Sequence, residues 1–170
     1  MLELNKLYNM DCMEGMKEFP DKKYFDELTR ISKNEIIWGW NYYTDILGKS
    51  ESLIFWDKGI GCGYSRGEIA ITSFNHKIKL VKISRNSERT KFPAIHPCQK
   101  PIALYRWLLQ NYAKPGDKII DTHAGSASSV IACLEEGFEY CAFELDVDYF
   151  TAATKRIEDW KEQGRLFNVR

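Results

Sequence analysis

Residues 118–144, KIIDTHAGSASSVIACLEEGFEYCAFE, decide the fold of this chain. A short apolar run ends at Asp121, a turn of small residues follows, and a helical pattern then covers residues 130–136. A second strand-like run ends at Glu144. This order of strand, small-residue turn, helix and strand is typical of nucleotide-binding α/β sheets. Small residues let a ligand approach the backbone, and the helix N-terminus offers free N–H groups.

The acids that end the two strands indicate which ligand fits. Glu144 follows Asp121 by 23 positions (144 − 121), close to the spacing of roughly 20 at which the acid of the dinucleotide fingerprint accepts from ribose. The turn lacks the G-x-G-x-x-G pattern, and Asp121 would repel a phosphate, so NAD is disfavoured. An adenosine ligand with a positive or zwitterionic end, such as S-adenosylmethionine, fits better. The alternative is an ordinary buried βαβ unit, whose small residues only permit close packing.

Length and composition limit the class of protein. The 170 residues predict a single domain over residues 1–170, and a formal net charge of zero means that nucleic acid would need a local basic patch. The five cysteines include no C-x-x-C pair, which disfavours a zinc cluster or a disulfide framework. We expect a cytoplasmic protein without membrane contact, because no run approaches the roughly 18 apolar residues of a membrane span.

Hydrophobic periodicity predicts an α/β fold. A mixed sheet is expected, with a β-hairpin formed by residues 68–74 and 77–84. The strands are expected at residues 2–9, 35–38, 53–56, 68–74, 77–84, 119–120 and 140–143, and the helices at 13–19, 24–31, 41–47, 102–112, 130–136 and 148–161.

Positive charge gathers between residues 77 and 91. Against one acid, Glu88, this stretch carries six basic residues, Lys77, Lys79, Lys82, Arg85, Arg89 and Lys91. Such a stretch would track a phosphate backbone, although a solvated hairpin is an equal alternative. Residues 92–101, FPAIHPCQKP, hold three of the five prolines and predict an irregular loop. We therefore expect residues 77–101 to form a basic DNA-contacting hairpin and loop.

Six segments in order carry a resemblance to a known family. They are a strand ending in Asp11-Cys12, IIWGWNYY (36–43), LIFWDKG (53–59), HPCQKP (96–101), DTHAGSASS (121–129) and Glu144. The chain resembles, over nearly its whole length, the S-adenosylmethionine-dependent DNA amino-methyltransferases of permuted motif order, which methylate adenine N6 or cytosine N4. The match departs from the family pattern at Cys98, where a threonine is usual, and at Ala127, where glycine is commoner.

The resemblance implies a Rossmann-like methyltransferase sheet with helices on both faces. It implies an enzyme that uses S-adenosylmethionine to methylate double-stranded DNA, adenine N6 favoured, as in restriction–modification; the oligomeric state is open and includes a homodimer. Cofactor-binding roles carry over to Asp11, His96, Pro97, Lys100, Pro101, Asp121, Gly125, Ser126, Ser128 and Glu144. Among these, Glu144 would hold the ribose hydroxyls, Asp11 would lie by the adenine amino group, and the 96–101 loop would close over the methionine end. In the alternative interpretation, Asp11 only caps the next helix, and the loop residues only fix its proline-rich backbone.

One family motif is absent from the sequence. The catalytic loop of the family reads Asp/Asn/Ser-Pro-Pro-aromatic, and none of the five prolines here is adjacent to another. It would be expected near Lys22-Lys23, where the pattern instead predicts another helix. Two explanations stay open. The segment is deleted, which would leave a catalytically inactive cofactor- or DNA-binding remnant, or the protein carries it and the printed sequence lacks it. No catalytic residue is therefore assigned.

Overall fold

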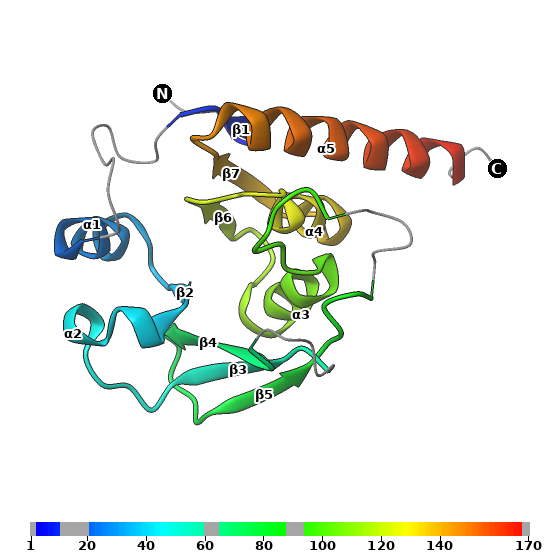
Figure 1. The fold of residues 1–170 in the computed structure, drawn as a ribbon. Helices are drawn as coiled ribbons and strands as arrows, with labels where there is room; N and C mark the ends of the chain where they lie inside the picture. The colour runs from blue at the N-terminus through cyan, green and yellow to red at the C-terminus, as the bar shows by residue number, and fades with distance from the viewer. Residues whose placement is uncertain (1–2, 11–20, 60–64, 88–93, 168–170) are drawn as a thin grey trace. The chain divides into compact units, whose positions relative to one another are not determined.

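The structure is a computed structural model, and it describes residues 3–10, 21–59, 65–87 and 94–167. The chain divides into two compact units: unit 1 holds residues 1–14 and 86–170, and unit 2 holds residues 15–85. Figure 1 labels the helices and strands of both. Each unit is described by itself, and the expectation of a single domain stays a prediction.

Unit 1 is built on a parallel sheet. Its strands lie in the order β1-β7-β6, with Ile120 of β6 opposite Cys141 of β7 and Tyr8 of β1 opposite Phe143. Because parallel neighbours need a crossover, α4 connects β6 to β7. The elements are β1 (Lys6–Tyr8), α3 (Ile102–Tyr112), β6 (Lys118–Asp121), α4 (Ser128–Glu136), β7 (Glu139–Phe143) and α5 (Val147–Phe167).

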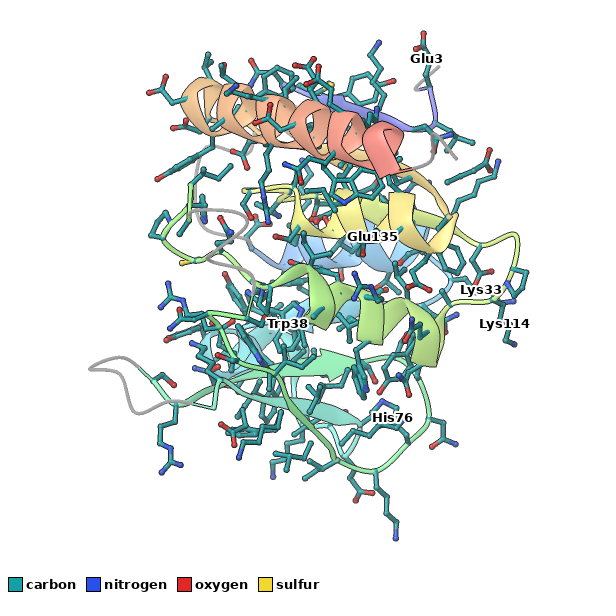
Figure 2. All side chains as sticks on the ribbon, turned by 90° about the vertical axis from the view of Figure 1, so that its right-hand side faces the viewer. Glu3, Lys33, Trp38, His76, Lys114 and Glu135 are labelled. Atoms are coloured by element: carbon teal, nitrogen blue, oxygen red, sulfur yellow. The ribbon has the colours of Figure 1, made fainter. Side chains whose placement is uncertain are left out.

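The core of unit 1 lies around α4. Val130 and Ile131 are at most 1% exposed, and they cluster with residues of α3, β7 and α5. At the edge of this core, Glu135 of α4, labelled in Figure 2, pairs with Arg106 of α3. It also accepts a hydrogen bond of 3.3 Å from the indole of Trp160 on α5. The helix that follows the small-residue turn is thus fixed on several sides.

Unit 2 is built on a mixed sheet of order β2-β4-β3-β5. The ring of Trp38 on β2, labelled in Figure 2, meets the buried ring of Trp56 on β3 edge to face at 6.2 Å. Next to it, Lys58 is 7% exposed and pairs with Glu68 at 2.8 Å. The elements are α1 (Lys22–Ile31), β2 (Ile36–Trp38), the 3-10 helix η1 (Trp40–Tyr42), α2 (Thr44–Leu47), β3 (Leu53–Asp57), β4 (Gly67–Thr72) and β5 (Lys79–Lys82).

The predicted α/β fold with a mixed sheet and a hairpin is confirmed, but the predicted hairpin partners were wrong. The hairpin is formed by β3 and β4, which run antiparallel. The strand β5, expected to pair with residues 68–74, instead lies parallel to β3, with Leu80 opposite Phe55. Apolar and polar alternation identifies a strand but not its neighbour in the sheet, which is why the sequence pattern misled here.

Most other elements agree with the periodicity. The helix expected at residues 102–112 has those bounds, whereas the last helix is longer than expected and covers Val147–Phe167. The place where the catalytic segment was sought holds the start of α1, capped by Asp21, whose carboxylate accepts from the Tyr24 amide at 2.9 Å. The helix expected at residues 13–19 lies outside the described residues. Across the described part of the chain, no helix is long and apolar enough to cross a membrane.

Candidate functional site

The carboxyl ends of β6 and β7 meet at one side chain, Glu144. One carboxylate oxygen accepts from the Gly125 amide at 2.8 Å, and the other accepts from the Asp146 amide at 2.9 Å. The β7–β6 contact continues past the strands, because the Ala124 amide donates to the Phe143 carbonyl at 2.8 Å. Glu144 therefore joins the turn after β6 to the turn after β7, and each oxygen keeps a lone pair for a further donor.

Asp121, at the end of β6, organises the turn that it opens. Its Oδ1 accepts from the His123 amide at 3.0 Å, and its Oδ2 accepts from the Ser129 hydroxyl in the first turn of α4 at 2.5 Å. The carboxylate thus ties the strand end to the helix start. The structure gives Asp121 this internal role, and its cofactor-binding role stays a prediction.

The turn between β6 and α4 contains two left-handed residues. Gly125 has φ 52° and Ala127 has φ 56°. A side chain in this region costs about 1–2 kcal/mol through contact of Cβ with the backbone, and this explains physically why glycine suits position 127. Ala127 is 0% exposed, so its methyl group is packed. The turn holds a conformation that the rest of the unit must stabilise.

Two of the predicted cofactor residues have their side chains in the interior. Ser126 and Ser128 are 5% and 2% exposed, and their hydroxyls lie 3.2 Å apart. Arg156 of α5 donates to the Ser126 carbonyl and to the Ser128 hydroxyl. These two serines can meet a ligand through their backbones rather than through their hydroxyls, and their predicted role in binding stays a prediction.

The proline-rich loop brings His96 to the turn. A Cβ added at Gly125 would lie 3.6 Å from Cγ of His96, an ordinary van der Waals distance, so the imidazole lies against the turn backbone. The ring also meets Tyr149 of α5 edge to face, with centroids 4.4 Å apart. Its Nδ1 accepts from the Cys98 amide at 3.1 Å, which places the proton of the neutral ring on Nε2. The structure thus brings His96, Gly125 and Glu144 together, and their cofactor-binding roles stay predictions.

The environment of His96 favours its neutral form. Burial lowers the pKa of His96 below its ordinary value of 6.5. The nearby carboxylates of Glu144 and Asp146 act to raise that pKa, and the charge of Lys100 acts to lower it. The imidazole is therefore neutral at physiological pH, and its acceptor nitrogen, Nδ1, already accepts from the Cys98 amide.

Sequence reasoning missed three residues at this site. Asn9, after β1, donates to the carbonyls of Glu144 and Leu145 at 3.0 and 3.2 Å and so fixes the backbone after β7. Leu145 is 57% exposed beside Glu144. The third is Arg156. An apolar residue directly after the strand-ending acid was a visible signal for Leu145, whereas nothing in the sequence singles out Asn9.

The remaining predicted residues are divided between the two units or lie outside the described residues. Lys77, Lys79, Lys82 and Arg85 belong to unit 2, in and beside β5, with Lys77 and Lys82 exposed. Asp11, Arg89 and Lys91 lie outside the described residues. Lys100 is half-buried in the loop before α3, and Pro101 is the N-cap residue of that helix.

The cysteine and the possible metal ligands near the site can be described for the residues that the structure covers. Cys133 of α4 is buried, and burial together with the charge of Asp121 raises the pKa of its thiol to about 12, so it stays protonated at neutral pH. Within the ranges that the structure describes, no group of three or more His, Cys, Asp and Glu side chains could hold a metal ion. The arrangement instead suits a ligand that donates hydrogen bonds to Glu144 and places apolar surface against Leu145.

His96 gives a pH prediction. Because its pKa is lower in the folded than in the unfolded chain, the unfolded chain binds more protons as the pH falls below 6.5, and the folded state loses stability through that window. In His96→Asn, where the amide oxygen can still accept from Cys98, this part of the loss disappears. Urea unfolding at about pH 7.5 and about pH 5.5 measures it, on either side of the ordinary histidine pKa. Equal losses in the two proteins would contradict the assignment.

Comparison with known proteins agrees with the predicted resemblance. A family model for DNA methylases of the N6/N4 type matches residues 11–155. Two proteins of Escherichia coli (strain K12) are similar over short stretches: YubD, named as a methylase, is 32% identical over 62 residues, and the DNA adenine methyltransferase YhdJ is 29% identical over 63 residues. These stretches cover 36% and 37% of this chain but only 27% and 21% of the relatives, about a quarter of their length.

The same fold occurs in a solved structure. The crystal structure of M1.HpyAVI in complex with SAM superposes with a TM-score of 0.62 at 18% identity, over 80% of this chain and 81% of the other. This likeness confirms the Rossmann-like methyltransferase fold, and the family match covers most of the chain. The chain belongs to the N6/N4 DNA methylase family.

Proposed function

We propose that unit 1 binds S-adenosylmethionine at the carboxyl ends of β6 and β7, and that the chain methylates an exocyclic amino group of a DNA base, adenine N6 favoured. The observation that carries the proposal is the Glu144 carboxylate, held by the amides of Gly125 and Asp146 at the ends of two neighbouring parallel strands. Ligands of open α/β sheets bind in this position, outside the carboxyl ends of the strands.

The two free lone pairs of Glu144 fit the two hydroxyls of a ribose. A carboxylate offers about four acceptor positions, and backbone amides use two of them here. Because these amides already fix the carboxylate in place, the side chain loses little conformational entropy when a diol binds. The exposed side chain of Leu145 follows directly and offers apolar surface to an adenine ring. This pairing of a fixed acid with an exposed apolar neighbour supports an adenosine ligand.

The other end of the cofactor would lie by the turn and the loop. His96 packs on Gly125 and Tyr149, and its neutral ring adds no positive charge that would repel a sulfonium. When bound, S-adenosylmethionine would supply an activated methyl group for the acceptor nitrogen, and S-adenosylhomocysteine and a proton released to water would be the other products. The residues of unit 1 would hold and orient the donor for that step.

A second candidate function is cofactor binding without turnover. The observation that favours it is the absence of adjacent prolines from the sequence, together with the capped start of α1 where the catalytic segment was expected. An amine is a weak nucleophile, so transfer needs residues that align it with the methyl carbon. The two candidates share the cofactor site and differ only in methyl transfer to DNA.

The cofactor site is tested at Glu144. In Glu144→Gln, one oxygen is replaced by an NH₂ that cannot accept from a hydroxyl and that opposes the amide of Gly125 or of Asp146. Loss of hydrogen bonds to a charged group amounts to about 1.5–3 kcal/mol, so affinity for S-adenosylhomocysteine is expected to fall about 10- to 150-fold in isothermal titration calorimetry.

The matched control for this test is Glu139→Gln. Glu139 is an exposed residue at the opposite end of β7 and pairs loosely with Lys118 at 3.7 Å. Its removal should leave the affinity unchanged. If the wild-type protein binds no S-adenosylhomocysteine, the proposed function is wrong. If Glu144→Gln binds as tightly as the wild type, Glu144 is not in the site.

Methyl transfer is tested with a labelled donor. The intact mass of the purified protein is first compared with 19.8 kDa. The protein is then incubated with labelled S-adenosylmethionine and double-stranded DNA, and the digested DNA is analysed by mass spectrometry. N6-methyladenine is expected. N4-methylcytosine would correct the target base, and binding without any methylated base would select the second candidate.

The basic stretch gives a DNA-binding prediction. If Lys77 and Lys82, both exposed, contact phosphates, the double variant Lys77→Ala/Lys82→Ala binds duplex DNA more weakly. Its slope of log affinity against log salt falls by about 0.9 for each lost contact. Fluorescence anisotropy at several salt concentrations measures both. The control is Lys33→Ala/Lys49→Ala, which removes two exposed lysines of unit 2 outside the stretch, and equal effects of the two pairs would argue against a defined contact.

A further inference from the structure

Arg156 is a charged side chain in the interior of unit 1. It lies on α5 between the buried residues Ala153 and Ile157 and is itself 5% exposed. Its Nη1 donates to the Ser126 carbonyl at 2.6 Å and to the Ser128 hydroxyl at 2.9 Å. Burying a guanidinium is costly, and the two bonds that Nη1 makes to the turn offset part of that cost.

The carbonyl of Ser126, which accepts from Arg156, lies between the two left-handed residues of the turn. The Ser126 carbonyl belongs to the peptide bond that precedes Ala127, and left-handed residues stand on both sides of Ser126, at Gly125 and Ala127. Holding this carbonyl restricts the orientation of that peptide plane, and this limits both ψ of Ser126 and φ of Ala127. Strained backbone of this kind persists only where neighbouring groups determine it. Arg156 is such a group, and it acts from the interior side.

The second contact reaches the start of α4. Ser128 is the first residue of that helix, and its hydroxyl lies within reach of both Arg156 and the Ser126 hydroxyl. The side chain of Arg156 therefore joins the turn to the helix that follows. On the other side of the turn, the Gly125 amide donates to Glu144 at 2.8 Å.

We propose that Arg156 is a positioning residue: it holds the turn of residues 125–128 in the shape that directs the Gly125 amide to Glu144, and it thereby sets the affinity of the cofactor site. This inference rests on the proposed function for its effect on the cofactor. Its effect on the turn stands without that function. In this role Arg156 acts through the Ser126 carbonyl and the Ser128 hydroxyl and not by contact with the cofactor.

The test compares three variants of the full chain. Arg156→Met keeps an unbranched apolar side chain and removes both hydrogen bonds. Arg156→Lys keeps the charge and one donor group. The matched control, Lys155→Met, removes a positive charge from the preceding residue, whose side chain is 75% exposed and pairs with Asp159 at 3.6 Å. Circular dichroism establishes that each variant is folded at the temperature of measurement.

Two measurements are made on each variant. Calorimetric titration with S-adenosylhomocysteine should show affinity at least 10-fold weaker for Arg156→Met, within about threefold of wild type for Arg156→Lys, and unchanged for Lys155→Met. Amide hydrogen exchange should rise selectively at residues 125–129 in Arg156→Met, whereas the strands β6 and β7 keep their protection. A merely structural role would raise exchange throughout unit 1.

The outcomes separate the two proposals. If the wild type binds no cofactor, the proposed function fails, and exchange at residues 125–129 still decides whether Arg156 orders the turn. If the wild type binds and Arg156→Met binds equally well, the positioning role is overturned. If Arg156→Met does not fold, Ser128→Ala replaces it: removing the hydroxyl that accepts from Arg156 should raise exchange at the same residues, and unchanged exchange overturns the inference.

Discussion

The site depends on one constraint: the parallel register of β6 and β7 brings their carboxyl ends together, and a carboxylate must be satisfied where they meet. Asp121 pairs with Ala142 across the strands, so Glu144 emerges directly beside the turn that Asp121 opens. Its carboxylate accepts from two backbone amides, and no ion pair joins it to a cationic side chain among the residues that the structure describes. The carboxylate is thereby fixed in position while lone pairs stay available, which is the property that a diol-binding acid needs.

The local signals in the sequence predicted the elements of this unit well. The apolar spacing of residues 102–112 gave a helix with those bounds, and the strand, turn, helix and strand of residues 118–144 formed in the expected order. The pairing of the strands was harder to predict from the sequence, because β5 pairs with β3, and β4 lies between these two strands in the chain. Alternation in a strand fixes which residues face the core, but it holds no information on which strand lies alongside.

The residues of the candidate site could be picked out where chemistry is visible in the residue type, although their binding roles stay predictions. The strand-ending acid, the left-handed glycine and the loop histidine could be located from the sequence, whereas the directions of Ser126 and Ser128 could not. Their hydroxyls lie in the interior with Arg156. An arginine among the charged residues of a long helix is normally exposed, so no pattern identified it. Ala127 was noted as a departure from the family, and its left-handed φ supplies the physical cost of that departure.

Binding the methyl donor and aligning the amine that accepts the methyl group are separate tasks, and different residues would carry them out. The groups that would hold the donor, Glu144, Gly125 and His96, all lie in unit 1 and contact one another directly or through the backbone. Aligning an amine with the methyl carbon requires further groups that bring the two reacting atoms to about 3–3.5 Å from each other. The sequence lacks the proline pair of the family loop that the resemblance assigns to this task. Affinity for the donor therefore tests unit 1, and transfer to DNA tests whether the rest of the protein completes the site.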